Sequence, residues 1–154
     1  GLTHSTIPYP DKHDCEMEIS KWTSLFELSV DVFGEYKHLL NQYFSGNQVD
    51  LSSITVDYSR ATLFFQAAWG ACRLIPFGET RSYKWIAAET KHPNAFRPAG
   101  RAMSCNKLPI VVPCHRVIGS NGKLTGYKGT DLQLDLKAQL LQLEANAVTS
   151  HLKA

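Results

Sequence analysis

A cysteine and a histidine stand side by side in the stretch "LPIVVPCHRVIGS", residues 108–120. The run 108–112 is short, apolar and β-branched, which predicts a buried strand, and Pro113 ends it because proline lacks a backbone donor. A thiol becomes a strong nucleophile as its thiolate, and a free cysteine with a pKa of ~8.5 is mostly protonated near neutral pH. His115 is therefore a candidate base for Cys114.

Neighbouring side chains on a strand point to opposite faces, so this pair can cooperate only where the chain turns or a water bridges them. Pro113 before the pair and "IGSNG" after it predict a turn. Glu144 extends an apolar stripe of the last predicted helix, and a carboxylate there is costly to bury unpaired. One interpretation is a Cys–His–Glu chain. The other is a buried structural cysteine, a surface histidine and an exposed helix end. The stripe before Glu144 consists of Leu132, Leu136 and Leu140.

The composition is that of an ordinary globular protein. With 154 residues, 44% of them apolar, the chain can form one domain or two small ones. No apolar stretch approaches the ~18 residues of a membrane helix, and the chain start has no signal pattern. We expect a monomer without contact to membranes, cytoplasmic, or nuclear in a eukaryote.

The four cysteines favour free thiols, because they show no CxxC pair and no tight spacing. A zinc site built from His4, His13 and Cys15 lacks a fourth ligand at useful spacing. We therefore expect no metal and no cofactor.

Charge divides the chain into two parts. Residues 1–65 carry four basic and nine acidic residues, a net charge of −5, whereas residues 66–154 carry twelve basic and five acidic residues, a net charge of +7. A basic second part suits a polyanion, since neutralised phosphates release counterions. A solvated basic face would look the same.

The first part combines a predicted strand and a predicted helix. Apolar residues alternate over 26–32, and helical spacing over 36–43 ends at Gly46, a plausible C-terminal cap. Residues 51–58 are a strand or a linker. A boundary near 59–63 gives two expected domains, an N-terminal α/β region at 1–62 and a second domain at 63–154.

The second part is mainly helical. One helix carries Phe65, Trp69 and Cys72 on one face, Ser82 caps a second helix, and a third covers roughly 95–104. Two short helices joined by a turn fit a helix-turn-helix, although any helical hairpin looks similar. The last helix begins with a capping-box pattern at Thr130 and Gln133. The expected fold class is α/β (α+β), with a mainly helical, winged-helix-like DNA-binding domain.

The stretches "PCHRVIGSNGKLTGYKG" and "FQAAWGACRLIPFGETRSYKWIA" resemble the O6-alkylguanine-DNA alkyltransferases, the methylated-DNA–protein-cysteine methyltransferases. The resemblance spans about residues 64–145, and the stretch "HLLNQYFSG" resembles the family more weakly. It implies DNA repair by direct reversal: an alkyl group moves irreversibly from O6 of guanine in double-stranded DNA, or from O4 of thymine, to a cysteine of the protein. Each molecule then reacts once.

The same resemblance implies roles for the active-site residues. Cys114 matches the alkyl acceptor, His115 takes its proton through a water, and Glu144 in "K..LL..E" holds that histidine. Asn106 matches the asparagine of the turn before the active site, although Lys107 replaces the usual proline.

The resemblance also implies a DNA face and a base pocket. The target base must be flipped out of the stack. Arg97 matches the residue that fills the vacated space, and Tyr83 matches the one that presses on the phosphates and touches the flipped base. Arg101 stands where a glycine is common, and Pro98 directly follows Arg97. The DNA face further includes the small residues Ala99, Gly100 and Ala102, together with Ser120.

The pocket follows from the same match. Tyr127 forms its wall, the Lys128 amide reaches O6, and the carbonyls of Cys114 and Val117 read the guanine amino group. Met103 and Pro109 line the alkyl side.

Two other functions remain open at this stage. A non-catalytic relative would bind alkylated bases, but such proteins lack the acceptor cysteine. A Cys–His hydrolase would need an oxyanion hole and would turn over repeatedly.

Overall fold

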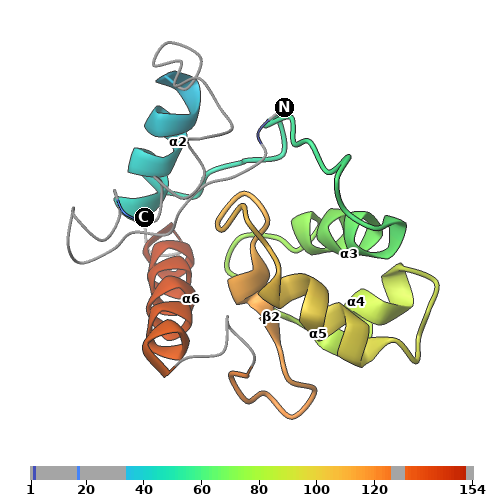
Figure 1. Ribbon diagram of the computed structural model, residues 1–154. Helices are drawn as coiled ribbons and strands as arrows, with labels where there is room; N and C mark the ends of the chain where they lie inside the picture. Colours follow the sequence, from blue (N-terminus) through green and yellow to red (C-terminus); the bar gives the residue numbers. More distant parts are fainter. Residues whose placement is uncertain (1, 3–16, 18–33, 126–130, 152–154) are drawn as a thin grey trace.

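The computed structural model describes residues 2, 17, 34–125 and 131–151 (Figure 1). The fold is mixed and dominated by helices, with one small pair of strands. The elements follow the chain as α2 (Gly34–Phe44), α3 (Leu63–Arg73), β1 (Arg81–Ser82), α4 (Tyr83–Glu89), α5 (Phe96–Ser104), the 3-10 turn η1 (Cys114–Arg116), β2 (Val117–Ile118) and α6 (Asp131–His151).

Helices α3, α4 and α5 pack on one another as a three-helix group (Figure 1). The starts of α3 and α4 are set by side-chain caps, since the Thr62 hydroxyl accepts from the Phe65 amide and the Ser82 hydroxyl accepts from the Trp85 amide. The predicted cap at Ser82 is confirmed. Helices α4 and α5, joined by residues 90–95, form the expected helix-turn-helix.

A short parallel pairing ties this group to the predicted active site. Arg81 of β1 pairs with Val117 of β2, and Ser82 pairs with Ile118. Because β2 directly follows η1, the pairing fixes the turn that carries Cys114 beside the start of α4.

The stretch 108–112 is buried as expected, but the prediction of a strand there was wrong. The Val112 amide donates to the Leu108 carbonyl at 2.8 Å, and Ile110 has a φ of 72°. The Asn106 side chain satisfies two further backbone groups, accepting from the Leu108 amide and donating to the Val112 carbonyl. These local bonds take the place of a strand partner, so the segment folds as a compact turn.

Helices α2 and α6 stand together on the other side of η1 (Figure 1). Tyr43 of α2, Leu51, Ile110 and Leu140 of α6 share a small apolar cluster. The predicted helix over 36–43 and its end at Gly46, with a φ of 83°, are confirmed. Residues 51–58 form a linker with one isolated bridge, between Leu2 and Val56.

Some predictions lie outside the described residues: the strand over 26–32 and the capping box that begins at Thr130. Within the described part of the chain, no helix has the length and apolar character needed to cross a membrane.

Candidate active site

Cys114 and His115 lie on the tight turn η1. The Cys114 amide donates to the Val112 carbonyl at 2.7 Å, and the Arg116 amide donates to the Pro113 carbonyl at 2.9 Å. On this turn the side chains of Cys114 and His115 can cooperate, because consecutive side chains need not point to opposite faces as they do on a strand. Cys114 is 4% exposed and His115 is fully buried.

His115 is oriented by Glu144, which α6 brings from 29 residues further along the chain. His115 Nε2 lies 2.8 Å from Glu144 Oε1. An imidazole that donates from Nε2 presents the lone pair of Nδ1, and Nδ1 forms no hydrogen bond with any described residue. Burial lowers the pKa of His115 and outweighs the opposing effect of Glu144, so the neutral base is favoured.

Glu144 is the centre of a buried hydrogen-bond network. Arg116 donates from Nη2 to Oε1 at 2.9 Å and from Nε to Oε2 at 2.9 Å, and the Gly78 amide donates to Oε2 at 2.9 Å. Tyr43 donates its hydroxyl to Oε1 at 2.7 Å. Burial would raise the pKa of Glu144, but the hydrogen bonds from His115 and Arg116 outweigh it and lower the pKa to about 2. The carboxylate therefore stays ionised at neutral pH.

Asn106 contacts the cysteine directly. Its Nδ2 lies 3.0 Å from Cys114 Sγ and also donates to the Val112 carbonyl at 2.8 Å. The N–H group points its positive end at the sulfur, where a thiolate would carry its charge. One buried amide thus shapes the turn before the cysteine and contacts its sulfur.

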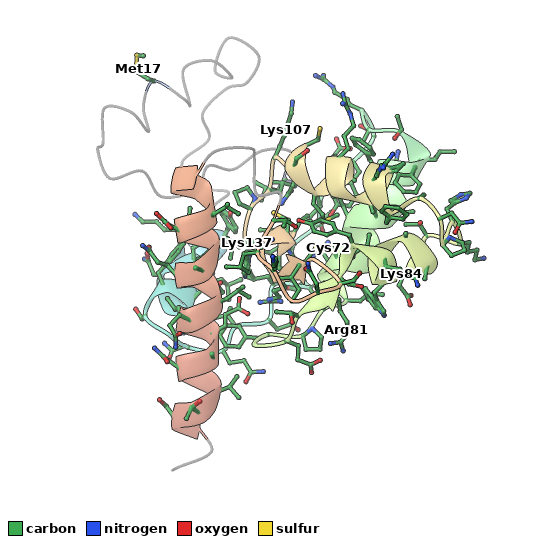
Figure 2. The ribbon with its side chains drawn as sticks, turned by 90° about the horizontal axis from the view of Figure 1, so that it is seen from below. Met17, Cys72, Arg81, Lys84, Lys107 and Lys137 are labelled. Atoms are coloured by element: carbon green, nitrogen blue, oxygen red, sulfur yellow. The ribbon has the colours of Figure 1, made fainter. Side chains whose placement is uncertain are left out.

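A buried lysine lies beyond the cysteine, on α6. Lys137 Nζ donates to the carbonyls of Val117 at 2.6 Å and Thr125 at 3.2 Å, and it lies 5.7 Å from the centre of the Tyr83 ring. Figure 2 shows Lys137 pointing from α6 toward the body of the molecule that holds Cys72. Burial lowers the pKa of Lys137 to about 8. The Val117 carbonyl, predicted to read the base, already accepts one hydrogen bond, and a carbonyl oxygen has two lone pairs.

Tyr83 stands at the start of α4, and its hydroxyl donates to the Thr125 carbonyl at 2.7 Å. Burial raises the pKa of Tyr83 to about 12. Gly100 of α5 faces this ring, because a Cβ added at Gly100 would lie 3.8 Å from a Tyr83 ring carbon.

The outer face of α5 is cationic, and its inner face is made of small residues. Arg97 and Arg101 are exposed, whereas Ala99 and Ala102 are fully buried in the core shared with α3 and α4. This corrects the expectation that Ala99 and Ala102 face DNA: with helical spacing, residues 99, 102 and 103 share the buried side. Gly100 is the small residue that is partly exposed.

The remaining predicted residues occupy different environments. Met103 and Pro109 are buried, and Ser120 is exposed in the turn that follows β2. Lys107 and Lys84 lie at separate places on the periphery (Figure 2). Tyr127 and Lys128 lie outside the described residues.

No cluster of three or more metal-ligating side chains occurs among the described residues. The alternative zinc ligands His4, His13 and Cys15 lie in the part of the chain that the structure does not describe.

Sequence reasoning missed Arg116 and Tyr43. Arg116 directly follows His115, and the other residues of this stretch are apolar or belong to the active site. A single charged residue in such a stretch could have indicated a role in the site. Tyr43 appeared to be an ordinary core position of its helix, and no local pattern links it to Glu144. On α6 the predicted stripe is confirmed at the described positions: Leu140 and Glu144 are buried and Leu136 packs against the core, while Lys137 and Ala147 extend the buried side.

The fold and site define a class: a helix-turn-helix domain with a buried cysteine that is adjacent to a histidine–glutamate pair. The sequence profile described as "6-O-methylguanine DNA methyltransferase, DNA binding domain" matches residues 63–146. The chain belongs to this family.

Similar proteins come from archaea and bacteria. The methylated-DNA–protein-cysteine methyltransferase of Methanosarcina mazei is 45% identical over 117 residues, which cover 75% of this chain and 70% of the relative. The constitutive enzyme of that name from Bacillus subtilis is 46% identical over 110 residues, 71% of this chain and 64% of the relative.

Solved structures agree with these relatives. The structure of OGT from Mycobacterium tuberculosis in complex with DNA matches with a TM-score of 0.66 and 42% identity, over 75% of this chain and 68% of that one. An O6-methylguanine-DNA methyltransferase from Pyrococcus kodakaraensis, 22% identical, shares the fold with a TM-score of 0.65, over 87% of this chain and 80% of that one.

Proposed function

We propose that this protein repairs double-stranded DNA by transferring an alkyl group from O6 of guanine to Cys114, once per molecule. O4-alkylthymine is the second substrate. The observation that carries the proposal is the buried Cys114–His115–Glu144 arrangement within the segment that matches the family. The family name and the DNA complex of a relative support the choice of substrate.

The transfer is a nucleophilic substitution at the alkyl carbon. The thiol proton of Cys114 passes through a water to His115 Nδ1, and the thiolate sulfur forms a bond to the alkyl carbon. The bond from that carbon to O6 breaks, and its electron pair moves onto the base. The base then takes up one proton, so an alkylguanine and a thiol become a guanine and a thioether. No hydrolytic step restores the thiol.

Three residues prepare the thiol for this step. His115 acts as the base, since its Nδ1 is the unpaired nitrogen. Glu144 holds the Nε2–H tautomer and offsets the positive charge that develops on the ring. Asn106 donates toward the sulfur and shapes the turn before it.

Base flipping costs a few kcal/mol, which contacts with the duplex must offset. Arg97 fills the space left by the flipped base, and Tyr83 contacts the base and the phosphates beside it. Gly100 allows close approach of α5, while Arg101 and Ser120 contact the backbone of the DNA. The base pocket is then formed by Val117, Met103, Pro109, Tyr127 and Lys128.

The direct test is intact-protein mass spectrometry after incubation with a duplex that contains one O6-methylguanine. We expect one added methyl group, mapped to Cys114, and no turnover beyond one equivalent. Cys114→Ala is the control and should bind the duplex without gaining mass. Tight binding by the wild type without a mass change would favour a non-catalytic sensor of alkylated bases. Repeated turnover of an acyl substrate would instead indicate a hydrolase.

The proposal extends to domain organisation and location. Residues 63–154 form the catalytic and DNA-binding domain, and residues 1–62 form a separate N-terminal region. The protein acts as a monomer. It acts in the cytoplasm, because the similar proteins described above come from bacteria and archaea, in which the chromosome lies in the cytoplasm. Light scattering and cell fractionation test these two statements.

A further inference from the structure

Tyr43 contacts the catalytic pair from outside the matched segment. It lies on α2, whereas the family profile begins at residue 63. Its side chain is fully buried, and its hydroxyl lies 2.7 Å from Glu144 Oε1 and 3.3 Å from His115 Nε2. A residue of the N-terminal region thus reaches the atoms that orient the base.

Arg116 donates to both oxygens of Glu144, and their other partners differ. Oε2 accepts from the Gly78 amide and from Arg116 Nε, and Oε1 accepts from Arg116 Nη2, His115 and Tyr43. Tyr43 and His115 therefore share one oxygen. A second donor on that oxygen draws electron density from it, so the carboxylate stabilises an imidazolium less strongly. The phenol also holds the oxygen at the position where it meets Nε2.

We propose, on the basis of the function proposed above, that Tyr43 is a positioning residue for alkyl transfer: its hydroxyl holds Glu144 and keeps His115 available as a neutral base. The chemistry of the second domain is then completed by a group from the N-terminal region. Tyr43 acts through Glu144 and does not touch the substrate.

The charged groups around His115 bear on any pH dependence. Glu144 and Lys137 face it from α6, Arg116 and the Cys114 thiol belong to its own turn, and Tyr43 faces it from α2. Glu144 favours the imidazolium, whereas Arg116 and Lys137 disfavour it. Removing the phenol leaves these groups in place and frees Oε1 to bind His115 more strongly. The pKa of His115 then rises.

The ring of Tyr43 has a separate packing role, which a phenylalanine would preserve. It makes edge-to-face contacts with Phe44 and Phe77, at centroid distances of 5.3 and 6.0 Å. Tyr43→Phe therefore removes only the hydroxyl. Tyr58→Phe is the matched control, because the ring of Tyr58 packs at a tilt against Trp69 and lies outside the Glu144 network.

The experiment measures two rates from pH 5 to 9 in the full chain: methyl transfer from an O6-methylguanine duplex, and alkylation of Cys114 by iodoacetamide, followed by peptide mapping. For Tyr43→Phe we expect both acid limbs to move to higher pH, with a loss of roughly tenfold near pH 6 and a smaller loss near pH 8. Tyr58→Phe should keep the wild-type profile. A difluorotyrosine at position 43, a stronger donor, should move the limbs the opposite way and covers the case in which the phenylalanine variant does not fold.

The outcomes separate this inference from the proposed function. Wild-type pH profiles in both Tyr43 variants would overturn the role of Tyr43, even if methyl transfer is normal. A uniform loss at all pH values would also overturn it, since disturbed packing alone gives that result. If the wild type transfers no methyl group but the iodoacetamide profile shifts as expected, the proposed function fails and the positioning role stands.

Discussion

The two proposed functional regions of this protein, the catalytic network and the DNA face, use charge in opposite ways. Around Glu144, four residues from three distant parts of the chain donate to one buried carboxylate: Tyr43, Gly78, and the adjacent His115 and Arg116. On the outer face of α5, Arg97 and Arg101 stand exposed to solvent above a core of small buried residues. Buried polar groups are costly to leave unpaired, whereas exposed cations are easily replaced. Changes in the first region should affect both folding and chemistry, and changes in the second should affect DNA binding alone.

The largest effect is expected from Glu144→Ala. The substitution leaves Arg116 and the hydroxyl of Tyr43 buried without their acceptor, which costs about 3–5 kcal/mol of unfolding free energy. Urea unfolding measures this loss. Glu144→Gln, which keeps the shape of the side chain and one acceptor oxygen, is the control and should lose less unfolding free energy. Equal stability of the alanine variant and the wild type would show that the network contributes nothing to the fold.

Acid should remove the contribution of Glu144 gradually. The pKa of Glu144 falls to about 2 in the folded protein from an ordinary value near 4.5. The folded state thus binds the proton less tightly than the unfolded state. The resulting stabilisation, about 3 kcal/mol, is present above pH ~4.5 and is lost as the pH falls toward 2.

Unfolding free energies of wild type and Glu144→Gln, measured from pH 7 to 2.5, test this window. The difference between the two proteins should shrink as the pH falls. A constant difference would contradict a low pKa for Glu144.

Arg97→Ala should separate DNA recognition from chemistry. Arg97 is exposed, so we expect no measurable loss of stability. Repair of a duplex should slow by roughly ten- to a hundredfold, because the flipped state loses support of a few kcal/mol. Reaction with a free O6-alkylguanine base should keep nearly its wild-type rate. Equal losses on both substrates would refute the role of Arg97 in flipping.

The smallest effect is expected from Arg101→Gly, which introduces the glycine that the family resemblance implies at this position. If Arg101 contacts a phosphate, the variant should bind DNA less tightly, by about the same factor for every DNA sequence. The magnitude of the slope of log affinity against log salt concentration should fall by about one. Lys37→Ala, on α2, is a control with the same charge change. An unchanged slope, or the same change in the control, would exclude a phosphate contact by Arg101.

Local sequence patterns predicted the helices well and one segment badly. Helical spacing, the Ser82 cap and Gly46 located helices that the structure confirms, since these signals act within one or two turns. The prediction of a strand over 108–112 was wrong because apolar, β-branched residues are equally suited to a buried turn. Its conformation depends on the side chain of Asn106, whose amide binds backbone groups on both sides.

By itself, the sequence determined the chemical groups and the local elements: a Cys–His pair before a turn, a glutamate that continues the apolar stripe of a helix, and two short helices in a basic half. Only the tertiary structure decided which groups meet. Tyr43 and Glu144 are 101 residues apart, and Gly78 and Glu144 are 66 apart. Helical and strand periods relate residues only within one element. The convergence of α2, the turn at Gly78, η1 and α6 on one carboxylate therefore follows from the packing of the whole chain.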